Sequence, residues 1–173
     1  MSRVLSCLDA CWPAPPQVRA FTTCRHVGLS QGPFSSFNVA DHVGDDETRV
    51  NTNRQTLQTA LQLPSAPRWL TQVHGDHVVD LDSAPSVSSI EADASLTRQA
   101  GVVCAVLTAE CLPVVLCDDQ GEVVAAVHAG WRGLAQGIVA SSIRAMGVPA
   151  AKILVWLGPA LSLIHISEPT RPY

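Results

Sequence analysis

Apolar residues recur with the period of an α-helix in two stretches of the chain. In the first stretch, Val50, Leu57 and Leu61 follow a run of acidic residues, which favour the N-terminus of a helix through its dipole. This pattern predicts an amphipathic helix over residues 45–61. The second stretch follows a glycine-rich turn and predicts a helix over residues 131–146.

Other stretches have the composition of β-strands. The clearest is the run 101–108, which is rich in β-branched residues and apolar on both faces, as a buried strand is. The segment 91–99 is poorly periodic and predicts no element. Shorter strands are predicted over residues 18–23, 69–74 and 153–157.

Two apolar segments, 114–117 and 123–127, flank a turn rich in Asp and Gly and predict a β-hairpin. If the turn has two residues, the register places Cys111 opposite His128. A bulged turn would shift the register by one or two residues. The spacing therefore predicts that this thiol and this imidazole lie close together, without fixing them as a pair.

The chain divides into three parts. Residues 1–17 are expected to be an irregular lead, because three prolines between residues 13 and 16 remove backbone donors and fix φ. Residues 18–160 form the predicted domain, whose strands and helices indicate an α+β fold, a layered sandwich with central β-sheets and flanking helices. Within it, residues 28–37 are rich in Gly, Ser and Pro and predict a structured loop long enough to carry function.

The last part, residues 161–173, resembles the translation of a transposase adapter used to prepare sequencing libraries. We therefore expect the native sequence to stop near residue 160 and the remainder to be a non-native tail. For this reason His165 supports no chemical argument.

Composition and charge exclude several classes of protein. Of the 173 residues, 47% are hydrophobic, which is incompatible with a disordered tail, and the net charge of -4 leaves no basic field for nucleic acid or an anionic membrane. The chain has neither an apolar stretch long enough to span a membrane nor the pattern of a signal peptide. We expect a cytoplasmic monomer that acts on small molecules.

The cysteines predict neither a disulfide framework nor a zinc knuckle. They are few for the length of the chain, and none forms a C-x-x-C pair, so reduced thiols are expected. The six are Cys7, Cys11, Cys24, Cys104, Cys111 and Cys117.

Three residues stand at or beside the ends of predicted strands, next to Gly or Pro: His74, Cys111 and His128. Two imidazoles and one thiolate form a three-ligand zinc set, and three protein ligands leave a fourth position for water or substrate, as catalytic zinc sites do. A structural zinc site would normally be closed by a fourth ligand, which Cys24 could supply. The residues thus predict a metal centre and favour a catalytic one.

Four sequence motifs resemble those of the YfiH-type laccase-domain family. Members of this family are described both as polyphenol oxidases and as purine nucleoside phosphorylases with adenosine deaminase activity. The similarity runs from about residue 21 to residue 160. The motifs are Gln72-Val-His74-Gly75, Ala92-Asp93-Ala94, Leu107-Thr-Ala-Glu-Cys111-Leu-Pro113 and Ala126-Val-His128-Ala-Gly-Trp-Arg-Gly133.

The resemblance implies that His74, Cys111 and His128 are zinc ligands, the same three residues that their chemistry singles out. Two departures are visible: Glu110 stands where the family usually has Asp, and Val27 where it has Gly. The family also continues well beyond its Gly-Pro-Ala segment. The resemblance therefore implies a fold that is incomplete at its C-terminal end.

The leading functional hypothesis is a zinc-dependent purine nucleoside phosphorylase that also deaminates adenosine, with phosphate as co-substrate. Its substrates would be nucleosides of the adenosine, inosine, guanosine and methylthioadenosine class. Catalysis would fall to Cys111 and to Glu110, the latter as proton shuttle by analogy with nucleobase deaminases. Arg25, Asn38 and Arg132 are candidates for holding phosphate or ribose, and a salt bridge or loop cap is an equally good explanation for each.

Two alternatives use the same residues. A copper-dependent polyphenol oxidase is opposed by the number of histidines, because the five outside the tail include no His-x-His pair and are too few for several copper centres. A metal-free cysteine hydrolase would use Cys111 as nucleophile and His128 as base, and it needs a third group to orient the imidazole.

Overall fold

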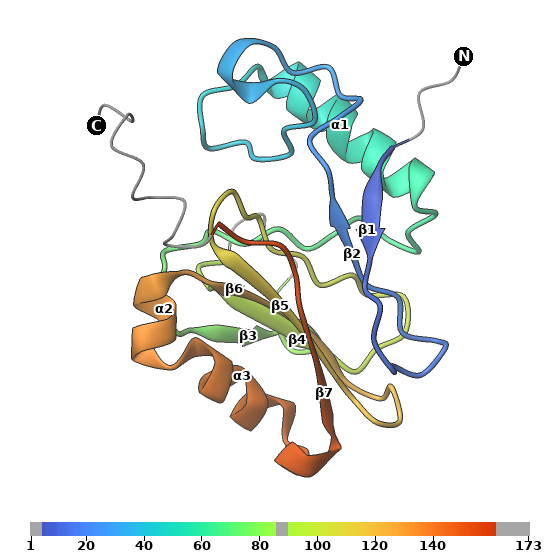
Figure 1. The fold of residues 1–173 in the computed structure, drawn as a ribbon, viewed down its shortest axis with the longest axis vertical. Helices are drawn as coiled ribbons and strands as arrows, with labels where there is room; N and C mark the ends of the chain where they lie inside the picture. Colours follow the sequence, from blue (N-terminus) through green and yellow to red (C-terminus); the bar gives the residue numbers. More distant parts are fainter. Residues whose placement is uncertain (1–4, 86–89, 162–173) are drawn as a thin grey trace.

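The computed structural model describes residues 5–85 and 90–161. Its centre is a five-stranded sheet in the order β3-β4-β6-β5-β7. Figure 1 shows the helices α2 and α3 along one side of this sheet, and the helix α1 with a small two-stranded sheet at the other end of the molecule. The strands of the large sheet are β3 (Val78–Asp80), β4 (Ala94–Thr97), β5 (Leu112–Asp118), β6 (Val124–Ala129) and β7 (Ile153–Leu157).

The large sheet is mixed but mainly antiparallel. Strand β3 is parallel to β4, whereas β4, β6, β5 and β7 pair antiparallel to one another. A regular parallel, doubly wound sheet is therefore absent from the part of the chain that the structure describes. The layered α+β class expected from the sequence is confirmed.

The main core lies between this sheet and the helices α2 (Trp131–Gln136) and α3 (Ile138–Met146). Leu96, Leu116 and Val127 from the strands pack with Ile138 and Met146 from α3, and each of these side chains is at most 1% exposed. Burial of these apolar side chains fixes α3 against the strands that carry the predicted site.

The helix predicted over residues 45–61 is confirmed as α1 (Glu47–Ala60). The Asp46 side chain caps it by accepting a hydrogen bond from the Arg49 N–H at 2.9 Å. On its inner face, the buried Asn53 side chain donates to the Asn38 carbonyl and accepts from the Leu29 N–H. This asparagine fastens the loop 28–38, which contains the short helix η1 (Gly32–Phe34), to α1.

The lead segment is more regular than the sequence indicates. It contains the strand β1 (Cys7–Asp9), which pairs antiparallel with β2 (Phe21–Thr23). The prolines expected to disrupt this region lie in the connection between the two strands. The strand predicted over residues 18–23 is shortened to β2.

Two predicted strands, 69–74 and 101–108, are wrong. Among the described residues, the β-pairing in or beside these segments is limited to isolated bridges, Arg68 with Cys104 and Thr71 with Glu91. The Gln72 side chain takes the place of a strand partner, because it accepts from the Leu107 N–H at 2.6 Å and donates to the Leu107 carbonyl at 2.8 Å. At Leu107 a side-chain amide therefore satisfies the backbone groups that a strand partner would otherwise bond.

Three strands have no counterpart in the sequence pattern, β1, β3 and β4, and of these β4 has neighbours on both sides in the large sheet. All four of its residues are buried, and Ser95 and Thr97 are among them. A strand covered on both faces has no apolar–polar alternation, and its polar residues also break the continuous apolar run that would reveal it.

The hairpin is confirmed as β5 and β6, but its register is shifted by two residues from the simplest prediction. Pro113 rather than Cys111 lies opposite His128. The turn is wider because the Asp118 carboxylate accepts from the N–H groups of Glu122 and Val123. Cys111 precedes β5 directly and therefore lies beside the end of the hairpin.

The helix predicted over residues 131–146 is divided in two at Gly137, which has a φ of 95° and separates α2 from α3. Gly147, with a φ of 71°, ends α3 as expected. The short helix η2 (Ala150–Lys152) then leads into β7, whose bounds match the prediction.

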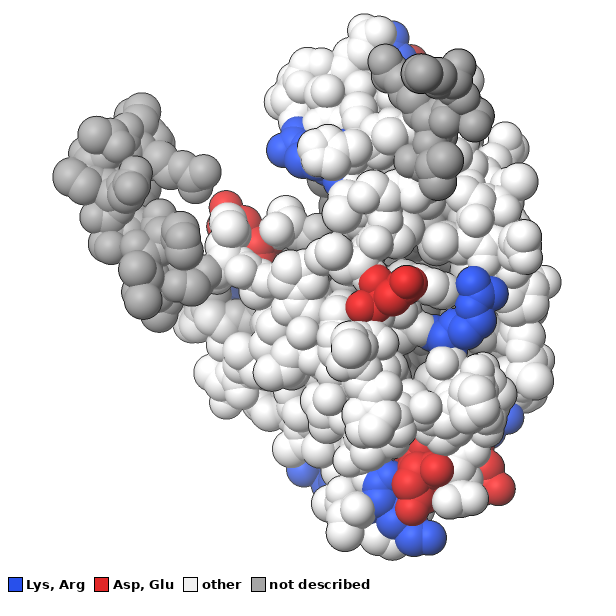
Figure 2. All heavy atoms as spheres, turned by 45° about the vertical axis from the view of Figure 1, so that its right-hand side comes forward, with Lys and Arg blue, Asp and Glu red and all other residues white. Residues whose placement is uncertain are grey.

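Of the predicted tail, only Leu161 falls within the described residues, and its N–H donates to the Glu110 carbonyl at 3.1 Å. The expectation for residues 162–173 lies outside them. Among the described helices, none has the length and apolar character needed to cross a membrane. On the face in Figure 2, charged side chains form small separate groups of both signs among uncharged atoms.

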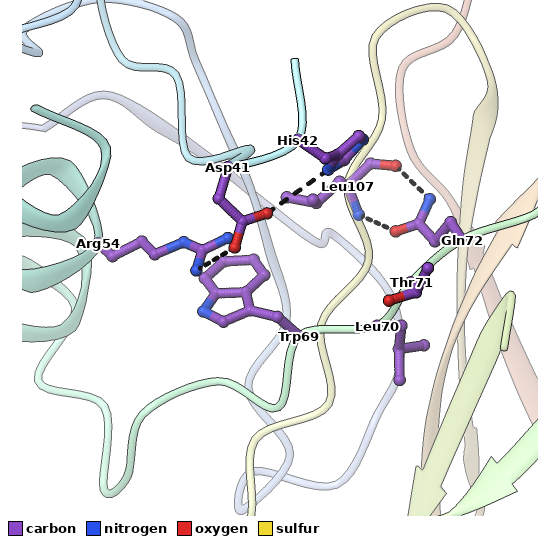
Figure 3. Close-up of a pocket in the computed structure, with 8 residues that line it drawn as sticks. All are labelled: Asp41, His42, Arg54, Trp69, Leu70, Thr71, Gln72 and Leu107. Atoms are coloured by element: carbon purple, nitrogen blue, oxygen red, sulfur yellow. Dashed lines mark hydrogen bonds and ion pairs between the residues drawn. The ribbon is translucent and has the colours of Figure 1, made fainter. Parts of the chain in front are cut away.

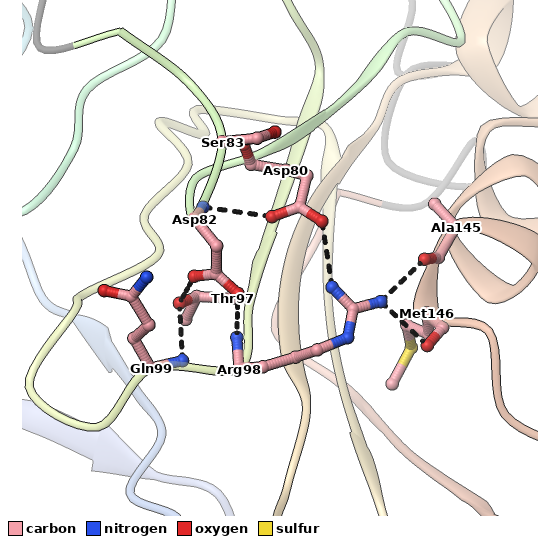
Figure 4. A network of polar contacts seen from close by, with 8 residues as sticks. All are labelled: Asp80, Asp82, Ser83, Thr97, Arg98, Gln99, Ala145 and Met146. Carbon is pink, nitrogen blue, oxygen red and sulfur yellow. Dashed lines mark hydrogen bonds and ion pairs between the residues drawn. The ribbon is translucent and has the colours of Figure 1, made fainter.

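Arg98, at the end of β4, ties the sheet to the C-terminus of α3 (Figure 4). Its guanidinium forms an ion pair with Asp80 at 2.8 Å and donates to the carbonyls of Ala145 and Met146 at 3.1 Å. A cation at this position satisfies the last carbonyls of a helix and complements its dipole.

Replacing this arginine tests the clamp. We expect Arg98→Ala to lower the free energy of unfolding by about 1 kcal/mol, because half-exposed charged hydrogen bonds are lost. Arg144→Ala is the matched control, since Arg144 donates to Ser141 within the same helix and, among the residues that the structure describes, does not join the helix to the sheet. Urea unfolding measures both, and equal effects of the two substitutions would contradict a special role for Arg98.

Candidate metal centre

The side chains of His74, Cys111 and His128 converge, although they come from three separate segments. His74 lies in the loop before β3, Cys111 directly precedes β5, and His128 lies within β6. One potential ligand atom from each lies within 4.8 Å of the other two. The Cys111 Sγ atom is 3.9 Å from His74 Nε2, and the two imidazole rings stand edge to face with centroids 4.7 Å apart.

This arrangement fits a single tetrahedral metal ion. Zinc with its usual bond lengths to sulfur and nitrogen would separate such ligand atoms by about 3.3–3.6 Å. The three atoms need only small inward shifts to reach these separations. Two imidazoles with one thiol match the donors that zinc prefers and leave a fourth position open.

Asp93 lies behind both histidines and is fully buried. Its Oδ1 atom accepts from His128 Nδ1 at 2.8 Å and from the His74 N–H at 2.9 Å. Its Oδ2 atom accepts from the N–H groups of Gly75 at 2.7 Å and Val73 at 3.2 Å. One carboxylate therefore contacts an imidazole on β6 and three consecutive backbone groups in the His74 loop.

These contacts decide the charge state of Asp93. Burial acts to raise the pKa of this carboxyl, but the hydrogen bonds from His128 and from the three N–H groups outweigh it and hold the pKa below its usual value. Asp93 is thus an ionised, hydrogen-bonded carboxylate at neutral pH. The sequence motifs include Asp93 but assign it no role. No periodic pattern distinguishes it from the residues of β4 that follow it.

The His74 loop adopts an uncommon backbone conformation. His74 has a φ of 60°, a value rare for residues other than glycine and found more often at functional sites. A Cβ at Gly133 would lie 2.8 Å from the Gly75 carbonyl oxygen, so α2 packs directly against this loop. The loop that holds this conformation therefore contacts the Asp93 carboxylate through its N–H groups and packs against α2 at Gly75.

Cys111, like Cys104 and Cys117, has a thiol with a raised pKa. Burial raises the pKa of Cys104 to about 12 and that of Cys117 to about 11, as expected for inert thiols. Burial, with the negative charges of Glu110 and Asp93, also raises the pKa of Cys111. Without a cation beside it, this thiol therefore stays protonated at neutral pH, and metal binding would release its proton.

The remaining predicted site residues occupy different positions. Glu110 is exposed and precedes Cys111, whereas Arg132 lies in the first turn of α2 with its guanidinium 5.3 Å from the centre of the Trp131 ring. The Arg25 guanidinium donates to the Ser35 carbonyl, and Asn38 bonds to Asp45 and to both backbone groups of Ala40. Arg25 and Asn38 are therefore bonded within the 25–45 region, and neither belongs to the His/Cys cluster.

A cavity of about 170 Å³ lies beside the segment that leads to His74 (Figure 3). Arg54 crosses it from α1, forming an ion pair with Asp41 at 3.1 Å and lying 4.6 Å from the centre of the Trp69 ring. Gln72, which lines the opposite side of the cavity (Figure 3), is hydrogen-bonded to the backbone of Leu107. Most of its polar side chains thus bond to one another or to neighbouring backbone.

A family model described as multi-copper polyphenol oxidoreductase laccase matches residues 19–165. The chain belongs to this family. The resemblance drawn from the four motifs is confirmed, and the His/Cys/His cluster lies within the matched residues.

Relatives with curated names are called purine nucleoside phosphorylases. One from Pseudomonas aeruginosa is 49% identical over 87% of this chain, and YfiH from Escherichia coli is 45% identical over the same share. Among solved structures, the Neisseria meningitidis protein NMB0706 has a TM-score of 0.84 at 45% identity over 90% of this chain. This chain covers 60–63% of the length of these three proteins.

Gly130 offers a direct test of the cluster geometry. A Cβ at this position would lie 2.9 Å from His74 Cδ2 and 3.1 Å from Cys111 Sγ. We expect Gly130→Ala to push these side chains apart and to weaken zinc binding by about tenfold, measured by competition with a chromophoric chelator.

The control is Gly137→Ala, which strains a left-handed residue but has no atom within 4 Å of the new Cβ. It should lower stability and leave zinc affinity unchanged. A Gly130→Ala protein with wild-type zinc affinity would show that the cluster does not form the metal site.

Proposed function

We propose that the protein is a zinc-dependent purine nucleoside phosphorylase that also deaminates adenosine. Its substrates would be adenosine, inosine, guanosine and methylthioadenosine, with phosphate as co-substrate. The observation that carries the proposal is the convergence of His74, Cys111 and His128 within 4.8 Å. The names of the relatives from Pseudomonas aeruginosa and Escherichia coli supply the phosphorylase half of it.

The donor set favours zinc over a cluster of copper ions. Among residues 5–85 and 90–161, this is the one group of three or more His, Cys, Asp or Glu side chains arranged to hold a metal ion. Oxidation by several copper centres needs more sites than one. When bound, zinc supplies a Lewis acid that activates water and orients phosphate.

The residues around the ion would divide the remaining work. Glu110, beside the ligand Cys111, would carry a proton between water and the purine ring during deamination. Arg132, in the first turn of α2 and two residues after Gly130, would hold phosphate or a ribose hydroxyl. Arg25 and Asn38, whose side chains bond within the 25–45 region, would also hold phosphate or ribose.

One observation favours a second candidate, the metal-free cysteine hydrolase. Such an enzyme needs a group that orients its imidazole base, and Asp93 holds His128 in that manner. Two others oppose it. A nucleophilic cysteine needs a lowered pKa, whereas that of Cys111 is raised, and the imidazole hydrogen-bonded to the Cys111 thiol is His74.

Two experiments together distinguish the zinc enzyme from the metal-free cysteine hydrolase: removal of the Cys111 thiol and treatment with a chelator. We expect Cys111→Ala to reduce zinc content from about one ion per chain to near zero and to abolish nucleoside cleavage, because the only anionic ligand is lost. Elemental analysis and release of purine base from inosine measure the two effects.

In the wild-type protein, a strong chelator should also abolish activity, and added zinc should restore it. Full activity after chelation, or in a zinc-free Cys111→Ala protein, would reject the metal mechanism. Restoration by copper alone would favour the oxidase instead.

Changing Glu110 tests the proton-transfer role. Glu110→Gln should leave zinc content unchanged and slow deamination of adenosine by about 10²–10⁴-fold, with a smaller effect on phosphorolysis of inosine. Glu122→Gln is the control, since Glu122 is an exposed carboxylate on the hairpin turn. Equal losses of both reactions in Glu110→Gln would remove the proton-shuttle role.

A further inference from the structure

Asp93 connects the two histidine segments of the metal centre. It joins β6 by two contacts, because its carboxylate accepts from His128 Nδ1 and its backbone carbonyl accepts from the His128 N–H at 2.7 Å. It joins the His74 loop by three more hydrogen bonds. Both oxygens of its carboxylate are occupied by these hydrogen bonds. Either oxygen would have to give up its partners before it could bind a metal ion between the three side chains.

We propose that Asp93 is a positioning residue that assembles the metal centre without binding the metal. This inference rests on the proposed metal site, and it concerns how the two imidazoles are brought to one ion. It assigns Asp93 two separate tasks, one on each histidine.

The first task is the choice of tautomer for His128. The carboxylate is an acceptor, so the His128 Nδ1 atom that faces it carries the proton. The lone pair is then on Nε2, the atom left to face Cys111 and His74. A histidine whose second nitrogen donates to a carboxylate is a better and better-oriented metal ligand.

The second task is the placement of His74. The three N–H groups of Val73, His74 and Gly75 point to the same carboxylate, which holds the loop where His74 has a φ of 60°. Without this acceptor, three backbone donors in a partly buried loop would lose their partner. His74 is the most exposed of the three ligands, so its position depends on the loop backbone more than on side-chain packing.

Asparagine at position 93 has the same shape and one acceptor fewer. If its oxygen replaces Oδ1, its amide group meets the N–H groups of Val73 and Gly75, donor against donor. If the amide is turned over, the donor conflict moves to His128 and His74. In either orientation one of the two tasks fails.

The test compares Asp93→Asn with Asp118→Asn. Both residues are buried carboxylates that accept backbone hydrogen bonds in or directly beside the same sheet. Asp118 caps the hairpin turn through Glu122 and Val123 with a single oxygen, Oδ1, so asparagine can keep this cap and the hairpin register. We expect Asp93→Asn to weaken zinc binding 10–100-fold and Asp118→Asn to leave it unchanged, both measured by chelator competition. Thermal unfolding of the zinc-free proteins reports the stability of each variant.

A second measurement needs no variant. Nitrogen NMR of the zinc-free wild-type protein should show His128 with its proton on Nδ1. The tautomer with the proton on Nε2, or wild-type zinc affinity in a folded Asp93→Asn protein, would overturn the proposal. If wild-type protein binds zinc but cleaves no nucleoside, the proposed function fails while this inference stands, so the two failures are distinguishable.

Discussion

The arrangement of the His/Cys/His cluster depends on the hydrogen bonds of one buried carboxylate, that of Asp93. It has no contact with solvent and accepts hydrogen bonds from four N–H donors, which keep it ionised in a site where burial alone would favour its neutral form. Because these donors belong to β6 and to the His74 loop, one buried charge fixes two otherwise unrelated segments. A buried charge is tolerated only when its hydrogen bonds are complete, so the geometry around it is restricted.

The surrounding fold places Cys111, the third residue of the cluster, in a different way. Cys111 is placed by the hairpin of β5 and β6, whose register brings the residue before β5 next to Gly130. The absence of a side chain at Gly130 lets the thiol and the His74 ring approach, and the absence of one at Gly133 lets α2 pack on the same loop. Strand pairing, the close approach at two glycines and the buried carboxylate thus together determine where the three side chains of the cluster lie.

Much of this could be predicted from the sequence, and the failures have physical causes. Elements with clear periodicity or clear ends were identified, such as α1 with its Asp46 cap and β7. The run 101–108 has the composition of a strand but lacks a ladder, because the Gln72 side chain satisfies the backbone of Leu107. Strand β4 was missed because it is buried on both faces and carries polar residues.

His74, Cys111 and His128 stand out in the sequence because their chemistry is rare and because each has Gly or Pro within two residues, and the structure brings the three side chains together. Cys111 and His128 lie close together as predicted, because Cys111 directly precedes β5 at the open end of the hairpin. The register differs by two residues from that of a two-residue turn, since the Asp118 cap widens the turn. Asp93 had no assigned role, because an aspartate shows its function only when its hydrogen-bond partners are known. Those partners lie 18–35 residues away along the chain.

Anomalous X-ray diffraction at the zinc edge, from crystals grown with zinc, tests the central claim most directly. The account predicts one strong peak bonded to His74 Nε2, His128 Nε2 and Cys111 Sγ at about 2.0–2.3 Å, with Asp93 outside the coordination sphere. A peak elsewhere, a peak bonded to the Asp93 carboxylate, or no peak between the three side chains would contradict it.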